Sequence, residues 1–174
     1  LVGGQPKWRC AVALPTQLVV FPLLCSGVCG RSFSRSVFVV LFSAYMILDF
    51  LLVGGMSNIL KLHHCACLLG HFLVITKVNS LAFNIYFRGV AVLEIGSGCM
   101  NLFLIGHNTS WNMSAVCVYV VGMTGSNLVA LYVLRHWLRS PIPVMAKGIT
   151  TLLTTCILTL RQSSLIDNVQ RYPL

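Results

Sequence analysis

Two of the three acidic residues in this chain, Asp49 and Glu94, lie within stretches long and apolar enough to cross a membrane. A carboxylate near the centre of a bilayer costs about 2.5–3.5 kcal/mol on insertion scales, so such residues mark internal polar sites. The adjacent histidines His63 and His64 lie within another apolar stretch. These four side chains are therefore the first candidates for a buried site.

An imidazole beside a carboxylate is able to take a proton from an attacking amine or hydroxyl, or to accept an acyl group itself. His63, His64 and Asp49 are therefore the predicted catalytic residues. The same groups could equally hold a lipid head group without reaction. They could also serve only helix packing, with Tyr45, one turn before Asp49, as a hydrogen-bond partner.

Composition indicates the environment in which this site must work. The 174 residues are 57% hydrophobic and only 9% charged, whereas soluble proteins are about 25% charged. The net charge of +9 comes from basic residues spread singly or in pairs, which is typical of membrane-span flanks and not of a nucleic-acid-binding patch. The eight cysteines are interpreted as small apolar residues.

Six apolar stretches are predicted to form membrane-spanning helices, because none alternates between apolar and polar residues as barrel strands do. The first carries Pro15 and Pro22 and should be kinked. Short connections make neighbouring helices antiparallel, which predicts one compact all-α bundle over residues 1–174, with a polar tail at 161–174. The predicted spans are about 10–28, 36–56, 60–77, 81–106, 113–137 and 142–160.

Counting helical rise places the polar residues at a similar depth. Asp49 lies about 12 Å and His64 about 9 Å below the turn at Ser57. The helix that carries Glu94 starts at the opposite membrane surface, and counting along it places Glu94 about 10 Å from the surface at which Ser57 lies. The spacing therefore predicts one polar layer contributed by three helices.

Other polar residues have simpler interpretations. Arg88 is one possible partner for Glu94, and Ser126 and Asn127 are expected to bond neighbouring helices. A metal half-site is conceivable where His64, Cys67 and His71 share one helical face. No fourth ligand accompanies them, so no metal and no other cofactor is predicted.

Four segments together resemble the TLC-domain family, which includes ceramide synthases, TRAM-type proteins and small lipid-homeostasis proteins. Their order and spacing agree with that family over about residues 7–137. The segments are Lys7-Trp8-Arg9-Cys10, the stretch from Tyr45 to Asp49, Leu62-His63-His64-Cys65, and the stretch from Glu94 to Asn101.

The resemblance implies a ring of about six helices around a central polar cavity that holds an acyl chain, with a first helix absent from this chain. It implies that His63, His64 and Asp49 are active-site residues. It also implies that Glu94 and Asn101 are markers of the small TLC-domain subgroup. Together with His71 and Tyr45, they are the predicted ligand-binding residues. The implied partners are membrane lipids and acyl-CoA, and the implied location is the endoplasmic reticulum or another endomembrane.

Ceramide synthases carry aspartates after the histidine pair, and residues 92–98 of this chain contain none. We therefore expect a multi-pass membrane protein that handles acyl lipids in membrane lipid homeostasis. One alternative is an acyl-CoA-dependent N-acyltransferase. Another is a non-catalytic scaffold or cargo-receptor subunit.

Overall fold

The computed structural model describes residues 6–27, 30–52, 58–77, 80–106 and 111–171. Every regular element in these ranges is helical, which confirms the predicted all-α fold. The elements are α1 (Lys7–Pro15), the π-helix η1 (Thr16–Val20), α2 (Phe21–Ser26), α3 (Arg31–Leu52), α4 (Asn58–Lys77), α5 (Ser80–Gly106), α6 (Asn112–Arg139) and α7 (Val144–Arg171).

Five helical segments are long and apolar enough to cross a membrane, so the chain is a multi-pass membrane protein. They are Trp8–Ser26, Arg31–Leu52, Leu81–Gly106, Asn112–Arg139 and Val144–Gln170. Helix α4, with 20 residues, is long enough for the predicted sixth span, and its crossing of the membrane stays a prediction.

The first span is interrupted where its prolines predict. Pro15 ends α1, five residues of π-helix follow, and Pro22 lies in the first turn of α2. Because proline has no backbone N–H, the α-helical ladder cannot run unbroken through this segment. The span ends at Gly27, whose φ of 74° is the left-handed conformation that glycine adopts at helix ends.

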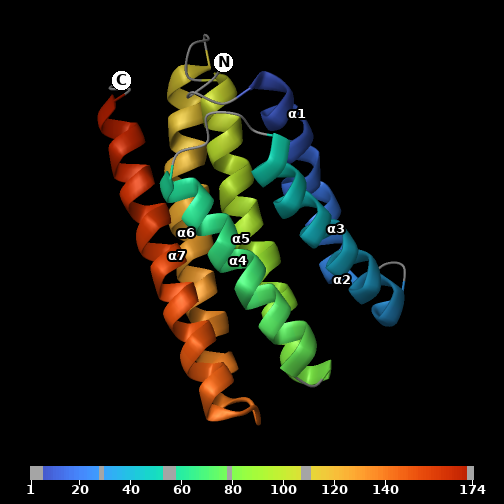
Figure 1. Cartoon of the computed structure of the whole chain (residues 1–174). Coiled ribbons are helices and arrows are strands. Elements are labelled where there is room, and N and C mark those ends of the chain that lie inside the picture. The colour runs from blue at the N-terminus through green and yellow to red at the C-terminus, as the bar shows by residue number, and fades with distance from the viewer. Residues whose placement is uncertain (1–5, 28–29, 53–57, 78–79, 107–110, 172–174) are drawn as a thin grey trace.

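Figure 1 shows how the helices are arranged. The antiparallel α5 and α6 form the middle of the bundle, with α7 on one side and α1–α2 and α3 on the other. Helix α4 crosses the front. Its first turns lie near α7, and the two helices diverge toward the α6–α7 connection. Both chain termini lie at the opposite end of the bundle from that connection.

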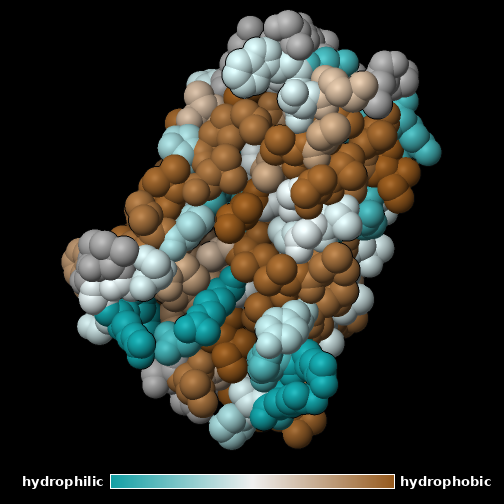
Figure 2. Space-filling model, turned by 180° about the vertical axis from the view of Figure 1, so that it is seen from behind, coloured by the Kyte–Doolittle hydropathy of each residue, from teal (hydrophilic) through white to brown (hydrophobic). Residues whose placement is uncertain are grey.

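The outer surface suits a lipid environment. Large apolar side chains are exposed around the bundle, including Val40, Leu51, Val121 and Leu152. Figure 2 shows a broad hydrophobic band across the rear face, with most hydrophilic residues toward the two ends. Such a surface would be unfavourable in water over this area.

Two apolar clusters hold the bundle together on either side of Glu94 along α5. One is an aromatic cluster that joins α2, α3 and α5, with Phe21, Phe38, Phe42, Phe83 and Phe87 at its centre. The other joins α5, α6 and α7 around Phe103, Tyr119 and Leu165. The polar residues therefore lie between two packed apolar regions.

The structure corrects one predicted boundary. Helix α7 continues without a break through Arg161 to Arg171, so most of the predicted polar tail is helix. Helix α3 is described as far as Leu52, and its predicted continuation to residue 56 lies outside the described residues. The predicted turn at Ser57 lies outside the described residues.

Candidate functional site

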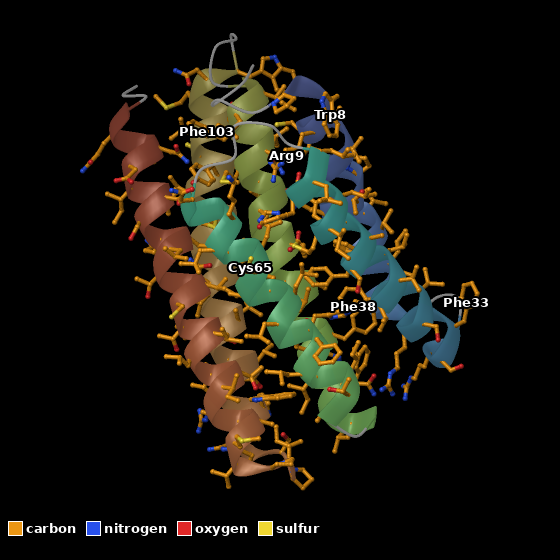
Figure 3. The ribbon with its side chains drawn as sticks, viewed as in Figure 1. Trp8, Arg9, Phe33, Phe38, Cys65 and Phe103 are labelled. Carbon is orange, nitrogen blue, oxygen red and sulfur yellow. The ribbon has the colours of Figure 1, made fainter. Side chains whose placement is uncertain are left out.

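Asp49 and His64, which the depth count assigns to one layer, are in direct contact. His64 Nε2 lies 2.7 Å from Asp49 Oδ2, which joins α4 to α3. Asp49 also binds Arg9 of α1, with Nε 2.6 Å from Oδ1 and Nη2 2.7 Å from Oδ2. This two-point arrangement is the strong geometry for an arginine and a carboxylate. Figure 3 shows Arg9 pointing into the bundle, whereas its neighbour Trp8 points away from it.

A second set of bonds centres on Gln17, a buried residue of the π-helix. Its Nε2 donates to Glu94 Oε2 at 2.7 Å and to the Tyr45 hydroxyl at 3.2 Å. Its Oε1 accepts from Asn101 Nδ2 at 2.8 Å. The side-chain amide of Gln17, on the π-helix, is thus hydrogen-bonded to both α3 and α5. Tyr45 and Glu94 bond Gln17 and not the partners first considered, Asp49 and Arg88.

Arg161 is the centre of a third set of hydrogen bonds. This α7 side chain is only 7% exposed. Its Nε donates to Asn127 Oδ1 at 3.0 Å, its Nη1 to Ser97 Oγ at 2.7 Å and its Nη2 to Ser126 Oγ at 3.0 Å. The expectation that Ser126 and Asn127 bond a neighbouring helix is confirmed, and the partner is a buried guanidinium.

A cavity of about 90 Å³ lies beside these groups, between α4, α5, α6 and α7. That is room for several water-sized groups. His63, Glu94 and Arg161 lie at its polar end. Most other lining residues are apolar, namely Phe42, Ala66, Ile85, Val90, Leu93, Ala130, Val133, Leu134, Leu153 and Ile157.

The cavity is not central to all the helices. Among the described lining residues, α3 contributes Phe42 and the α1–α2 span contributes none. The lining includes residues of α4 and α7, the two helices that diverge in Figure 1. The cavity therefore lies between α4, α5, α6 and α7, away from the α1–α2 span.

The adjacent histidines face different surroundings, as their positions on a helix predict. His64 is 2% exposed and contacts Asp49. His63 lines the cavity, with its Nε2 3.6 Å from Cys67 Sγ. Of the three predicted catalytic residues, only His63 reaches the cavity; His64 and Asp49 are not among its described lining residues.

The four predicted ligand-binding residues lie in three different places. Glu94 lines the cavity, whereas Asn101 and Tyr45 belong to the Gln17 set. His71 contacts the Tyr86 hydroxyl through Nδ1 at 2.9 Å and packs beside Phe42. His71 thus lies at the edge of the aromatic cluster, and its partner Tyr86 lines the cavity in its place.

Sequence reasoning missed three residues of the site. Arg9 and Arg161 were interpreted as span flanks, and Gln17 was not considered. One signal was available for Arg161, because it lies three residues after Leu158 and four before Leu165, and all three are buried. Helical spacing from two core leucines places a residue on the inward face.

Within the described ranges, no group of three or more histidine, cysteine, aspartate or glutamate residues could hold a metal ion. The conceivable half-site on α4 is also divided, because His64 contacts Asp49 and His71 contacts Tyr86. The donors at the cavity are instead an imidazole, a carboxyl group and a guanidinium, which suit hydrogen bonding to an organic ligand.

Comparison with known proteins identifies no relative. The chain matches no protein-family model, no curated protein and no solved structure. The resemblance to TLC-domain proteins therefore stays a prediction.

Proposed function

We propose that this protein binds an acyl lipid, with the apolar chain in the cavity and the polar end beside His63, Glu94 and Arg161. The observation that carries the proposal is a mostly apolar cavity whose polar lining groups include His63, Glu94 and Arg161. Small-molecule sites commonly combine an apolar lining with a few placed polar groups. The lining here matches that description in a protein already surrounded by lipid.

The position of the cavity supports entry from the membrane. Its lining residues on α4 and α7 belong to helices that diverge toward one end of the bundle. A lipid chain entering between these two helices would stay in apolar surroundings. Such binding fits a role in membrane lipid homeostasis, in the endoplasmic reticulum or another endomembrane, as the TLC resemblance implies.

Binding has better support than acyl transfer by His64 and Asp49. Arg9 occupies both oxygens of Asp49, and His64 approaches one of the same oxygens. Asp49 and His64 are 5% and 2% exposed. A general base must lie within hydrogen-bond reach of the proton that it removes. This pair is instead placed to join α1, α3 and α4.

The proposal can be tested with a neutral probe. The full chain in detergent micelles would be labelled with a long-chain alcohol that carries a photoactivatable diazirine in its chain. We expect the modified peptides to come from the cavity walls, especially the α7 segment with Leu153 and Ile157. Ala66→Phe places a ring at the cavity wall and should reduce this labelling strongly.

The matched control is Ala11→Phe, which adds the same ring at an exposed position of α1. It should leave labelling of the cavity peptides unchanged. Labelling spread evenly over outward-facing positions such as Val40 and Val121, or insensitive to Ala66→Phe, would show that the cavity takes no lipid chain.

A further inference from the structure

We propose that Arg161 recognises the carboxyl group of a long-chain fatty acid, and that Glu94 shares a proton with that carboxyl group. This inference rests on the proposed function, because it names the chemical class of lipid that the cavity takes. It follows from the hydrogen-bonding capacity of two buried side chains that meet at the same end of the cavity.

Arg161 has unused donors. A guanidinium carries five N–H groups, and three donate to Asn127, Ser97 and Ser126. Within the described part of the chain, two N–H groups are left for a ligand. Because Arg161 also lines the cavity, a group at the polar end is within reach of this side chain.

Arg161 also makes no direct ion pair with any described carboxylate. Its three acceptors are neutral, and both ion pairs among the described residues use Asp49 instead. A buried charge is costly unless it is paired or well hydrogen-bonded. An anionic group in the cavity would complete the surroundings of Arg161, and a carboxylate matches the planar fork of a guanidinium.

Glu94 favours a carboxyl group over a phosphate. Its Oε2 accepts from Gln17, and its Oε1 has no hydrogen bond to any described residue. Two carboxyl groups close together keep one proton between them, because both cannot ionise easily at short range. A fatty acid and Glu94 could therefore share one proton and one negative charge opposite Arg161. A phosphate dianion would add repulsion from Glu94.

The apolar wall provides the place for the chain. The lining residues of α7 run from Thr150 through Leu153, Thr154 and Ile157 to Arg161, a length of about 16 Å along the helix. Val133 and Leu134 of α6 line the same cavity. A chain lying along this wall would bring its terminal group to Arg161 and Glu94.

The test is a competition against the photoactivatable alcohol probe, using the full chain in detergent micelles at neutral pH. Hexadecanoic acid, hexadecanol and a lysophosphatidate with the same chain would each compete for labelling of the α7 peptide. We expect the acid to compete at least about tenfold better than the alcohol, as a charge-assisted bond implies. The lysophosphatidate should compete less well than the acid.

Arg161→Gln should bring the acid and the alcohol to within about twofold of each other, while Arg161→Lys should keep part of the preference. Arg88→Gln, at an exposed position of α5, is the matched control and should keep all of it. If Arg161→Gln does not fold, the wild-type comparison and Arg161→Lys still decide the question.

The possible failures are distinguishable. Equal competition by acid and alcohol in the wild-type protein, with cavity labelling intact, would overturn the carboxyl site and leave the proposed function standing. Preference for the lysophosphatidate would overturn it in favour of a phosphate site. Absence of cavity labelling by the alcohol probe would overturn both proposals.

Discussion

The guanidinium of Arg161 lies against Gly96, so that a Cβ atom at position 96 would overlap both Arg161 Nη2 and the Ser126 side chain. Glycine at this position lets α7 bring a long cationic side chain between α5 and α6. The small side chains of Ser97 and Ser126 then serve as its acceptors. Gly96 and Arg161, 65 positions apart in the sequence, therefore depend on each other.

Gly96→Ala should destabilise the bundle, because the added methyl group displaces Arg161 from its hydrogen bonds. Overpacking of this kind typically costs about 1–3 kcal/mol. The measurement is loss of far-UV circular dichroism as the SDS fraction is raised in mixed micelles. Gly125→Ala is the matched control, since a Cβ there meets no atom within 4 Å. Equal unfolding curves for Gly96→Ala and wild type would contradict this packing.

The polar layer could be predicted where ionisable residues interrupt apolar stretches. Asp49 and His64 lie in apolar stretches joined by a short connection, so counting helical rise was enough to bring them together. The separate roles of His63 and His64 followed from the angle between adjacent helical residues. Which of the two reaches the cavity depends on the rotation of α4 against α3, and that rotation is set by packing.

Arg9→Met should weaken the fold strongly, because it leaves Asp49 buried without its cation. Removing one partner of a buried ion pair typically costs about 3–5 kcal/mol. The same SDS titration measures the loss. The double variant Arg9→Met with Asp49→Leu removes both charges and should recover at least half of it. Arg88→Met, at an exposed arginine, should unfold like the wild type.

Unfolding of Arg9→Met at the wild-type SDS fraction would show that the ion pair contributes little. A double variant no more stable than Arg9→Met would show that His64 and the surrounding helices need the Asp49 carboxylate itself. The two comparisons therefore separate the stability contributed by the Arg9–Asp49 ion pair from the stability contributed by the Asp49 carboxylate alone.

Gln17→Leu should be destabilising by about 3 kcal/mol, because it removes the bonds to Glu94, Tyr45 and Asn101 at once. Asn101 would lose the hydrogen bond of its Nδ2, and its Oδ1 is already buried without a partner among the described residues. Gln170→Leu changes the same side chain at an exposed position and serves as the control. Unfolding of both variants at one SDS fraction would argue against Gln17 as the common partner.

Gln17 and Arg161 show why part of the site was beyond sequence reasoning. Gln17 lies in an apolar stretch with prolines on both sides, and its inward direction depends on five residues of π-helix that no apolar repeat predicts. Arg161 follows an apolar stretch, where arginines usually mark the membrane surface. Its burial requires acceptors from α5 and α6, which lie 34 to 64 positions away in sequence.

His63→Leu and His64→Leu should change different properties of the protein, although the residues are adjacent. His64→Leu removes a bond to the buried Asp49 carboxylate and should lower stability by about 1–3 kcal/mol. His63→Leu changes the polar end of the cavity and should alter labelling by the alcohol probe while shifting unfolding by less than about 1 kcal/mol. Each variant is the other's control, measured by SDS titration and by labelling of the α7 peptide. If His64→Leu alone changed the labelling and left stability intact, the ligand would have to lie beside Asp49, and the cavity at His63 would lose its role.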